Sequence, residues 1–140
     1  MTILFLCTGN SCRSQMAEAW ARTLWPAPYQ AVSAGTHPQG MNPVTATVMA
    51  EVGIDLSEHW SKSVDDLDLA TVDVLATVCD SAYEACPHIP GVPVAVHHSF
   101  PDPYAAGLDP TDDAVLNVYR AVRDEIKTWV EQLPGTLERE

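Results

Sequence analysis

The chain is 140 residues long, and its 46% hydrophobic and 19% charged residues are the proportions of an ordinary globular protein that buries its own core. Acidic residues outnumber lysine and arginine by 19 to 7, and the net charge of −12 argues against nucleic acid or an anionic membrane as a partner. The apolar run after Met1 spans only about six residues without a basic leader, which predicts neither a signal peptide nor a membrane span. We therefore expect one cytoplasmic domain over residues 1–140, and a monomer.

The spacing of apolar residues predicts strands and helices that alternate along the whole chain. The predicted strands are residues 2–7, 29–34, 72–78 and 92–97. The predicted helices are residues 14–24, a helix that starts at Asn42-Pro43 and stops at Gly53, and a last helix that starts near Asp109-Pro110 and is closed by Pro134-Gly135. This alternation indicates an α/β fold of three α/β/α layers around a four-stranded parallel sheet with right-handed crossovers. We expect the strand order 2-1-3-4.

Three reactive side chains are predicted at one edge of this sheet. Cys7 ends the first predicted strand, Cys79 follows the third and Asp102 follows the fourth. Parallel α/β sheets bind their ligands at the carboxyl ends of the strands. The sequence therefore predicts that these three residues face a common site.

An anion-binding loop is predicted between the first strand and the first helix, where residues 7–14 read Cys-Thr-Gly-Asn-Ser-Cys-Arg-Ser. A strand–loop–helix connection of this kind directs several backbone N–H groups and a helix N-terminus at one point. Gly9 permits a tight turn, Asn10 tolerates a left-handed conformation and Arg13 can offer a bidentate fork to a tetrahedral oxyanion. The predicted substrate-binding residues are Thr8, Gly9, Asn10, Ser11, Cys12, Arg13 and Ser14.

Cys7 is the predicted nucleophile of this loop. The field that holds an anion is expected to lower the pKa of the thiol from about 8.5 toward roughly 3.5–7.5, and the Ser14 hydroxyl is expected to donate to its sulfur. A Cys-x5-Arg pattern alone has little specificity, and a buried strand-end cysteine near a surface arginine is the plain alternative. The position between an apolar strand and a helix favours a functional site. Cys12 is interpreted as structural, contributing its N–H rather than its sulfur.

The second cysteine pair, Cys79 and Cys86, indicates redox chemistry rather than plain phosphate-ester hydrolysis. In a cytoplasmic protein such thiols are expected to remain reduced and to serve catalysis or metal binding, although two unrelated core cysteines are also possible. A zinc site is disfavoured, because the six intervening residues do not match zinc-finger spacing and the histidines supply no second pair of ligands. No metal is therefore expected.

Residues 7–20 resemble the beginning of the thioredoxin-coupled arsenate reductases, which share the fold of the low-molecular-weight protein tyrosine phosphatases. The resemblance covers most of the chain. It continues through Ser33-Ala34-Gly35, Asn42-Pro43, Cys79, Cys86 and Phe100-Pro101-Asp102-Pro103. It implies that Cys7 is the nucleophile and that Asp102, in its Asp-Pro pair, is the general acid; by itself an Asp-Pro aspartate would be interpreted as a solvated turn residue.

The geometry of the expected sheet permits a disulfide between Cys7 and Cys79, because neighbouring strands lie about 4.8 Å apart, inside the Cα window of about 4.4–6.8 Å. A helix from Cys79 to Cys86 would instead separate them by roughly 10.5 Å. A Cys79–Cys86 bond therefore requires the segment to unwind, and Pro87, Pro90 and Gly91 favour a loop there. We predict a redox-switched segment over residues 80–91.

The expected function is reduction of arsenate to arsenite by a relay from Cys7 to Cys79 to Cys86. Reduced thioredoxin would be the partner that regenerates the enzyme, and no cofactor is expected. A low-molecular-weight phosphatase is the main alternative; it would need only Cys7, Arg13 and Asp102 and would leave the second cysteine pair unexplained. A non-enzymatic oxyanion or thiol redox sensor is the other alternative.

The resemblance also concerns potassium, which some relatives bind beneath the loop with residues that match Asn10, Glu18 and Ser33. Trp60, Ser61 and Lys62 occur where further oxygen ligands are expected. The hypothesis for this chain is that the Lys62 ammonium supplies the positive charge itself.

Overall fold

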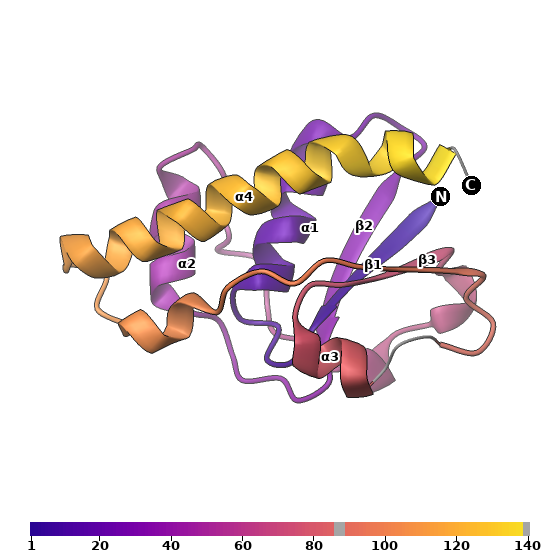
Figure 1. The fold of residues 1–140 in the computed structure, drawn as a ribbon, viewed down its shortest axis with the longest axis horizontal. Helices are drawn as coiled ribbons and strands as arrows, with labels where there is room; N and C mark the ends of the chain where they lie inside the picture. The colour runs from indigo at the N-terminus through magenta and orange to yellow at the C-terminus, as the bar shows by residue number, and fades with distance from the viewer. Residues whose placement is uncertain (86–88, 139–140) are drawn as a thin grey trace.

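A four-stranded parallel sheet forms the centre of the protein (Figure 1). The computed structural model describes residues 1–85 and 89–138, so Cys86 lies outside the described residues. The sheet has the predicted order β2-β1-β3-β4, and every neighbouring pair is parallel. Its strands are β1 (Thr2–Cys7), β2 (Gln30–Gly35), β3 (Val74–Thr77) and β4 (Val94–His97).

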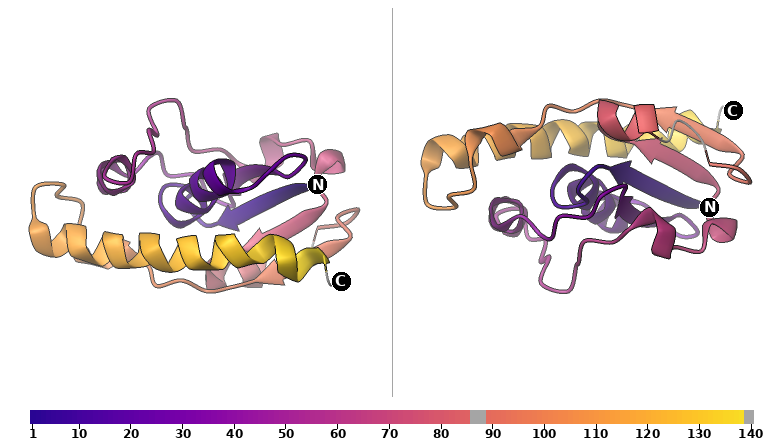
Figure 2. Two further views of the ribbon diagram at one scale, coloured as in Figure 1. Left: turned by 90° about the horizontal axis from the view of Figure 1, so that it is seen from above. Right: turned by 90° about the horizontal axis from the view of Figure 1, so that it is seen from below.

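The helices are connected to these strands in the expected alternation. They are α1 (Arg13–Leu24), α2 (Pro43–Ala50), α3 (Asp80–Ala85) and α4 (Asp113–Glu138), with 3-10 turns at Val64–Asp66, Leu69–Thr71 and Pro103–Ala106. Figure 2 shows α4 running along the length of the molecule beside α1. In the described part of the chain, no helix combines the length and the apolar content that crossing a membrane requires.

The centre of the sheet is apolar because β1 lies between two other strands. Residues 3–6 of β1 are fully buried, whereas the edge strand β4 alternates between half-buried and exposed residues. Phe5 contacts the rings of Trp25 and Trp129, which brings β1, the end of α1 and α4 into one aromatic cluster. Burial of this kind contributes roughly 1.5–3 kcal/mol for each large apolar side chain.

The first half of the chain folds as its local signals predict. Asn42 caps α2, since its Oδ1 atom accepts hydrogen bonds from the N–H groups of Val44 at 2.8 Å and Thr45 at 3.3 Å, and Pro43 occupies the first helical position. Gly53 follows the end of α2 with a φ of +84°.

The prediction for the last helix was wrong at both ends. The Asp109 carboxylate accepts the N–H of Thr111 in a turn, and α4 begins only at Asp113. At the other end the helix continues through Pro134 to Glu138. Proline has no N–H for the carbonyl of Val130, four residues earlier, and the Trp25 indole donates to that carbonyl instead, at 2.9 Å. The proline therefore leaves no carbonyl unpaired at this position.

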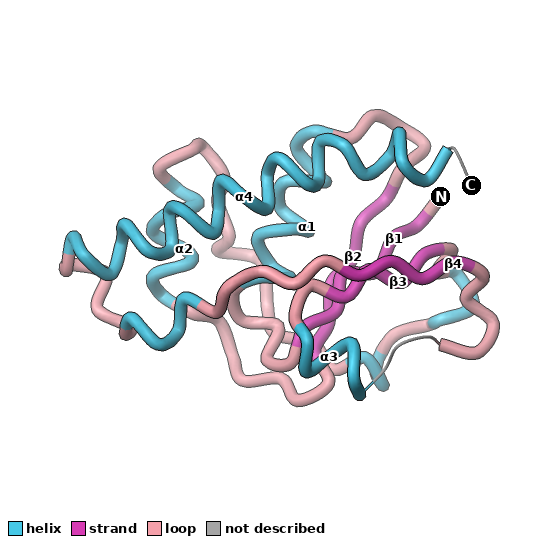
Figure 3. Tube along the Cα trace, viewed as in Figure 1, coloured by secondary structure: helices cyan, strands magenta, loops and turns pink. Residues whose placement is uncertain are grey.

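The strands of the second half are shorter than predicted, and the segment that follows β3 is not entirely a loop. Residues 80–85 of the predicted redox-switched segment form α3, because the helix-breaking Pro87 and Pro90 lie beyond its end. Figure 3 shows α3 at the same end of the sheet as the loop that leaves β1. The carboxyl ends of β1 and β3 thus bring the predicted site residues to one edge.

Candidate functional site: a thiol in an oxyanion loop

The loop between β1 and α1 turns its carbonyl groups outward. The carbonyls of residues 8–11 accept hydrogen bonds from donors outside the turn, at 2.8–3.3 Å. The donors are the backbone N–H groups of His37, Gln39 and Asn42 and the side chains of Gln15 and Ser61. Because the C=O and N–H of a trans peptide point in opposite directions, this arrangement directs the intervening N–H groups to the inside of the loop. The N–H of Asn10 lies 3.2 Å from the Cys7 sulfur, as this predicts.

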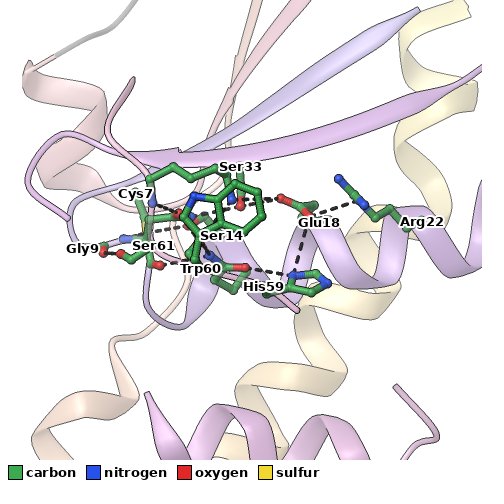
Figure 4. Close-up of polar contacts among 12 residues, drawn as sticks. Cys7, Gly9, Ser14, Glu18, Arg22, Ser33, His59, Trp60 and Ser61 are labelled. Atoms are coloured by element: carbon green, nitrogen blue, oxygen red, sulfur yellow. Dashed lines mark hydrogen bonds and ion pairs between the residues drawn. The ribbon is translucent and has the colours of Figure 1, made fainter. Parts of the chain in front are cut away.

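Asn10 connects the loop to β2 and α1. Its φ is +47°, in the left-handed region that an asparagine was expected to tolerate. Its side-chain amide donates to Ser14 Oγ at 2.8 Å and to Ser33 Oγ at 3.0 Å, while its Oδ1 accepts from Gln15 Nε2 and the Lys62 N–H. All four of these hydrogen-bonding positions are therefore filled in a fully buried amide. Figure 4 shows this network reaching from Cys7 to Glu18.

Gly35, at the end of β2, allows the loop to lie against the sheet. A Cβ atom on this residue would lie 2.6 Å from the Thr8 carbonyl oxygen and 3.0 Å from the Asn10 nitrogen. Both neighbours are backbone atoms of the loop, so no side chain could move aside to relieve the contact. In the sequence Gly35 had no role beyond its place in the resemblance, and only the folded structure shows the close approach.

The Cys7 thiol is buried at the end of β1 and lies 2.8 Å from the Ser14 hydroxyl, the predicted contact. Ser14 accepts from Asn10, so its single proton is free to point at sulfur. The predicted lowering of the pKa is wrong. Burial raises the pKa of Cys7 above its ordinary value, and the hydrogen bonds from Ser14 and Asn10 only oppose that effect.

The Cys12 thiol lies in different surroundings from the Cys7 thiol. It is buried at the N-terminus of α1, where burial raises the pKa of its thiol to about 12. A thiol with such a pKa is almost entirely protonated at neutral pH, which disfavours it as a nucleophile. Its sulfur makes no capping hydrogen bond to the first turn of α1, which agrees with the interpretation of Cys12 as a backbone position.

Arg13 and Asp102 lie next to each other at the mouth of the loop. The Asp102 carboxylate is 3.7 Å from the Arg13 guanidinium and also accepts the N–H of Tyr104 at 3.0 Å. A second Arg13 nitrogen donates to the Phe100 carbonyl, which fixes the side chain over the loop. Asp102 is the more exposed of the pair, with 55% of its side-chain surface accessible against 15% for Arg13. A proton donor in this position could exchange with solvent between turnovers.

Cys79 lies two residues after the end of β3 and next to the loop. Its sulfur is 3.6 Å from the Thr8 hydroxyl, and the residue is buried. Cys7, Cys12 and Cys79 are all free thiols. The structure thus brings Cys7, Arg13, Cys79 and Asp102 together around the loop, whereas the prediction for Cys86 falls outside the described residues.

Glu18 is a buried carboxylate that lies among three basic side chains. Its oxygens lie 3.0 Å from Arg22 Nε, 3.6 Å from His59 Nδ1 and 3.8 Å from Lys62 Nζ, and they accept a 2.6 Å hydrogen bond from Ser33. Burial lowers the pKa of the Lys62 ammonium. The nearby Glu18 carboxylate opposes this lowering.

The atoms matched to a potassium site are already engaged with protein groups. The Oδ1 of Asn10 accepts two N–H donors and the Ser33 hydroxyl lies between Asn10 and Glu18, while the Lys62 ammonium donates to the Trp60 carbonyl at 3.0 Å. A resident potassium ion therefore does not fit this arrangement well, and Lys62 places a positive charge near the same carboxylate.

Sequence reasoning missed Gln15 and His59. Gln15 is fully buried and donates to Asn10 and to the Trp60 carbonyl, and its Oε1 lies 3.1 Å from His59 Nδ1. The signal for Gln15 was a polar residue in the first turn of a helix that should be apolar on its inner face. His59 had no comparable signal, because its segment has no regular structure.

The sequence matches the family model described as low molecular weight phosphotyrosine protein phosphatase over residues 2–140. It is 43% identical over 133 residues to an arsenate reductase of Halalkalibacterium halodurans, which covers 92% of this chain and 94% of the relative. It is 42% identical over 130 residues to arsenate reductase 2 of Staphylococcus epidermidis, with 93% of each chain covered.

Solved structures agree with the sequence relatives. An arsenate reductase in its oxidized state superposes with a TM-score of 0.80 at 28% identity, covering 96% of this chain and 97% of the other. An arsenate reductase in its phosphate-binding state superposes with a TM-score of 0.77 at 29% identity, with the same coverage. The chain belongs to the low molecular weight phosphotyrosine protein phosphatase family.

Proposed function

We propose that this protein reduces arsenate to arsenite with electrons from thioredoxin. The observation that carries the proposal is a second buried thiol, Cys79, 3.6 Å from Thr8 of a loop built to hold an oxyanion around the first, Cys7. Hydrolysis of a phosphate ester needs no such thiol. The names of the relatives that are about 40% identical support the same activity.

The first step would be attack of Cys7 on arsenic. Arsenate would lie among the inward N–H groups of the loop and against Arg13, and the Cys7 thiolate would form a sulfur–arsenic bond. Asp102 would protonate an arsenate hydroxyl group, which leaves as water. Because burial raises the pKa of Cys7, its proton has to pass to an oxygen of the bound arsenate, and the hydrogen bonds from Ser14 and Asn10 stabilise the thiolate that results.

The second step would transfer two electrons. Cys79 attacks the Cys7 sulfur, the Cys7–Cys79 disulfide forms, and the electron pair of the broken sulfur–arsenic bond stays on arsenic, which departs as arsenite. Cys86 then attacks Cys79 and releases Cys7 as a thiolate, leaving a Cys79–Cys86 disulfide. The two thiols of reduced thioredoxin return this disulfide to the dithiol form by exchange.

Phosphatase activity is the second candidate, because Cys7, Arg13 and Asp102 would suffice for it. Their placement around the loop would serve ester hydrolysis as well as arsenate reduction. The low molecular weight protein tyrosine phosphatase of T. tengcongensis has a TM-score of 0.78 with this chain at 26% identity. We propose that hydrolysis of aryl phosphates is a side activity. A sensor with the same thiols would bind the oxyanion without turning it over.

An assay with both substrates separates these functions. Purified protein is incubated with arsenate, thioredoxin, thioredoxin reductase and NADPH, and separately with an aryl phosphate. The proposal expects many turnovers of arsenate per protein, with arsenite as product. Hydrolysis of the aryl phosphate without arsenate turnover would identify a phosphatase, and at most one equivalent of arsenite would identify a sensor.

A test of Lys62 follows from its position beside Glu18. The activity of the unmodified protein is expected to be equal in potassium and sodium chloride at fixed ionic strength. Lys62→Met removes one positive charge beside Glu18, so its activity should fall and should recover by at least about threefold when potassium replaces sodium, because the cation can then supply the charge that Lys62 supplied. Lys127→Met, which removes a lysine of α4, is the control. A strong potassium response of the unmodified protein would contradict the hypothesis.

A further inference from the structure

His97, at the end of β4, connects three elements near Cys79. Its Nδ1 atom lies 2.7 Å from the Thr77 hydroxyl on β3, and its Nε2 atom lies 3.1 Å from the Asp80 carboxylate on α3. Its ring stacks on the ring of Tyr83, also on α3, with 4.3 Å between the centroids and 21° between the planes. We call Thr77, Asp80, Tyr83 and His97 the α3 clasp.

The hydrogen-bonding capacities of these groups fix the direction of the contact between His97 and Asp80. A carboxylate can only accept, so His97 Nε2 carries a proton and donates it to Asp80. Its Nδ1 pairs with the Thr77 hydroxyl, which can donate to an imidazole nitrogen or accept from one. Thr77 is buried and lies directly opposite His97 in the register of β3 and β4, so it holds the ring in a fixed orientation toward α3.

The clasp holds a helix that the relay has to disrupt. Asp80 and Tyr83 both lie within α3, and the N–H of Tyr83 donates to the carbonyl of Cys79. A helix running from Cys79 would separate it from Cys86 by roughly 10.5 Å, beyond disulfide reach. A Cys79–Cys86 bond therefore requires part of α3 to unwind, and the contacts of His97 with Asp80 and Tyr83 oppose this change.

We propose that His97 is a positioning residue that keeps α3 helical, and Cys79 next to the oxyanion loop, until Cys86 attacks. This inference rests on the proposed relay. In the step concerned, a bond forms between the sulfurs of Cys86 and Cys79 as the Cys7–Cys79 bond breaks, and Cys7 leaves as the thiolate, so no electrons are gained or lost by the protein. The clasp would stabilise the forms of the protein that precede this exchange.

The reduction potential of the Cys79–Cys86 disulfide measures this effect. Protein is equilibrated in glutathione redox buffers, and mass spectrometry maps the disulfide at each potential. His97→Ala destabilises the reduced form alone, so the disulfide should become about fivefold more favourable, which corresponds to a potential about 20 mV more negative. Tyr83→Ala should shift the reduction potential in the same direction. Tyr83→Phe, which retains a stacking ring, should have the potential of the original protein.

His98→Ala is the matched control, because the neighbouring ring of His98 stacks on Phe100 rather than on α3. Hydrogen exchange of the reduced protein gives a second readout: the amides of residues 80–85 should exchange faster in His97→Ala, with those of β1 unchanged. Aryl phosphate hydrolysis should stay within about twofold of the original rate, since it does not use α3.

The outcomes separate the clasp from the relay. Equal potentials and equal exchange for the original protein and His97→Ala would overturn the role of His97 and leave the relay standing. If the unmodified protein forms no Cys79–Cys86 disulfide after arsenate turnover, the relay itself is wrong, and the proposed role of His97 is overturned together with it.

Discussion

Replacement of Cys79 by serine should abolish thioredoxin-coupled arsenate turnover and leave aryl phosphate hydrolysis within about threefold of the original rate. The serine hydroxyl is close to the thiol in shape but does not form the disulfide that releases arsenite. Cys7, Arg13 and Asp102 stay in place, so the ester remains a substrate. The loss of arsenate turnover should be at least about a thousandfold, comparable to removal of a catalytic nucleophile. Cys86→Ser should have the same pair of effects.

Both assays are run on the same preparation of each variant. Aryl phosphate hydrolysis that persists shows that the variant is folded. Ser81→Ala, which removes an exposed hydroxyl from α3, should retain both activities. Thioredoxin-driven turnover that continues in Cys86→Ser would contradict the relay. Loss of both activities in Cys79→Ser would show instead that Cys79 supports the loop through its contact with Thr8.

The variant Gly35→Ala should lose both activities although it adds a single methyl group. The new Cβ would lie 2.6 Å from the Thr8 carbonyl oxygen, a distance that forces the loop backbone away from β2. A displacement of about 1 Å at a reacting centre can cost about a hundredfold in rate, and we expect a loss of at least this size in kcat/KM for both substrates.

Gly135→Ala is the matched control for this prediction. Gly135 lies in α4, and a Cβ there meets no atom within 4 Å. Alanine favours a helix, so this variant should keep its activity and gain up to about 1 kcal/mol in free energy of unfolding. Circular dichroism and urea unfolding would show whether Gly35→Ala is folded. Activity near the original level in folded Gly35→Ala would mean that the loop does not depend on its distance from β2.

The parts of the fold that were predicted correctly have signals within a few residues. An apolar run marks β1, and an Asn-Pro pair marks the start of α2. The end of α4 depends on Trp25, a residue more than one hundred positions away from Val130, whose indole takes the place of the N–H that Pro134 lacks. No local pattern contains that contact, so the proline was wrongly interpreted as the end of the helix.

In the candidate site, too, features that depend on neighbouring residues were predicted and features that depend on distant residues were not. Cys7, Asn10 and Ser14 contact one another inside one short loop, and the sequence predicted the contact between Ser14 and Cys7. Gly35 supports the loop from a different strand. The pKa of Cys7 was predicted in the wrong direction because the sequence shows the donors around a thiol but not how completely the fold removes water from it.

The outward carbonyls of the oxyanion loop have a consequence for selectivity. A ring of peptide N–H groups responds to the shape and charge of a tetrahedral anion, and arsenate and phosphate are nearly isosteric. Phosphate should therefore compete for the loop and act as an inhibitor that resembles the substrate. Discrimination would come after binding, because only arsenic readily takes up the electron pair when Cys79 attacks. Such an enzyme would select its substrate by its chemistry and not by its fit.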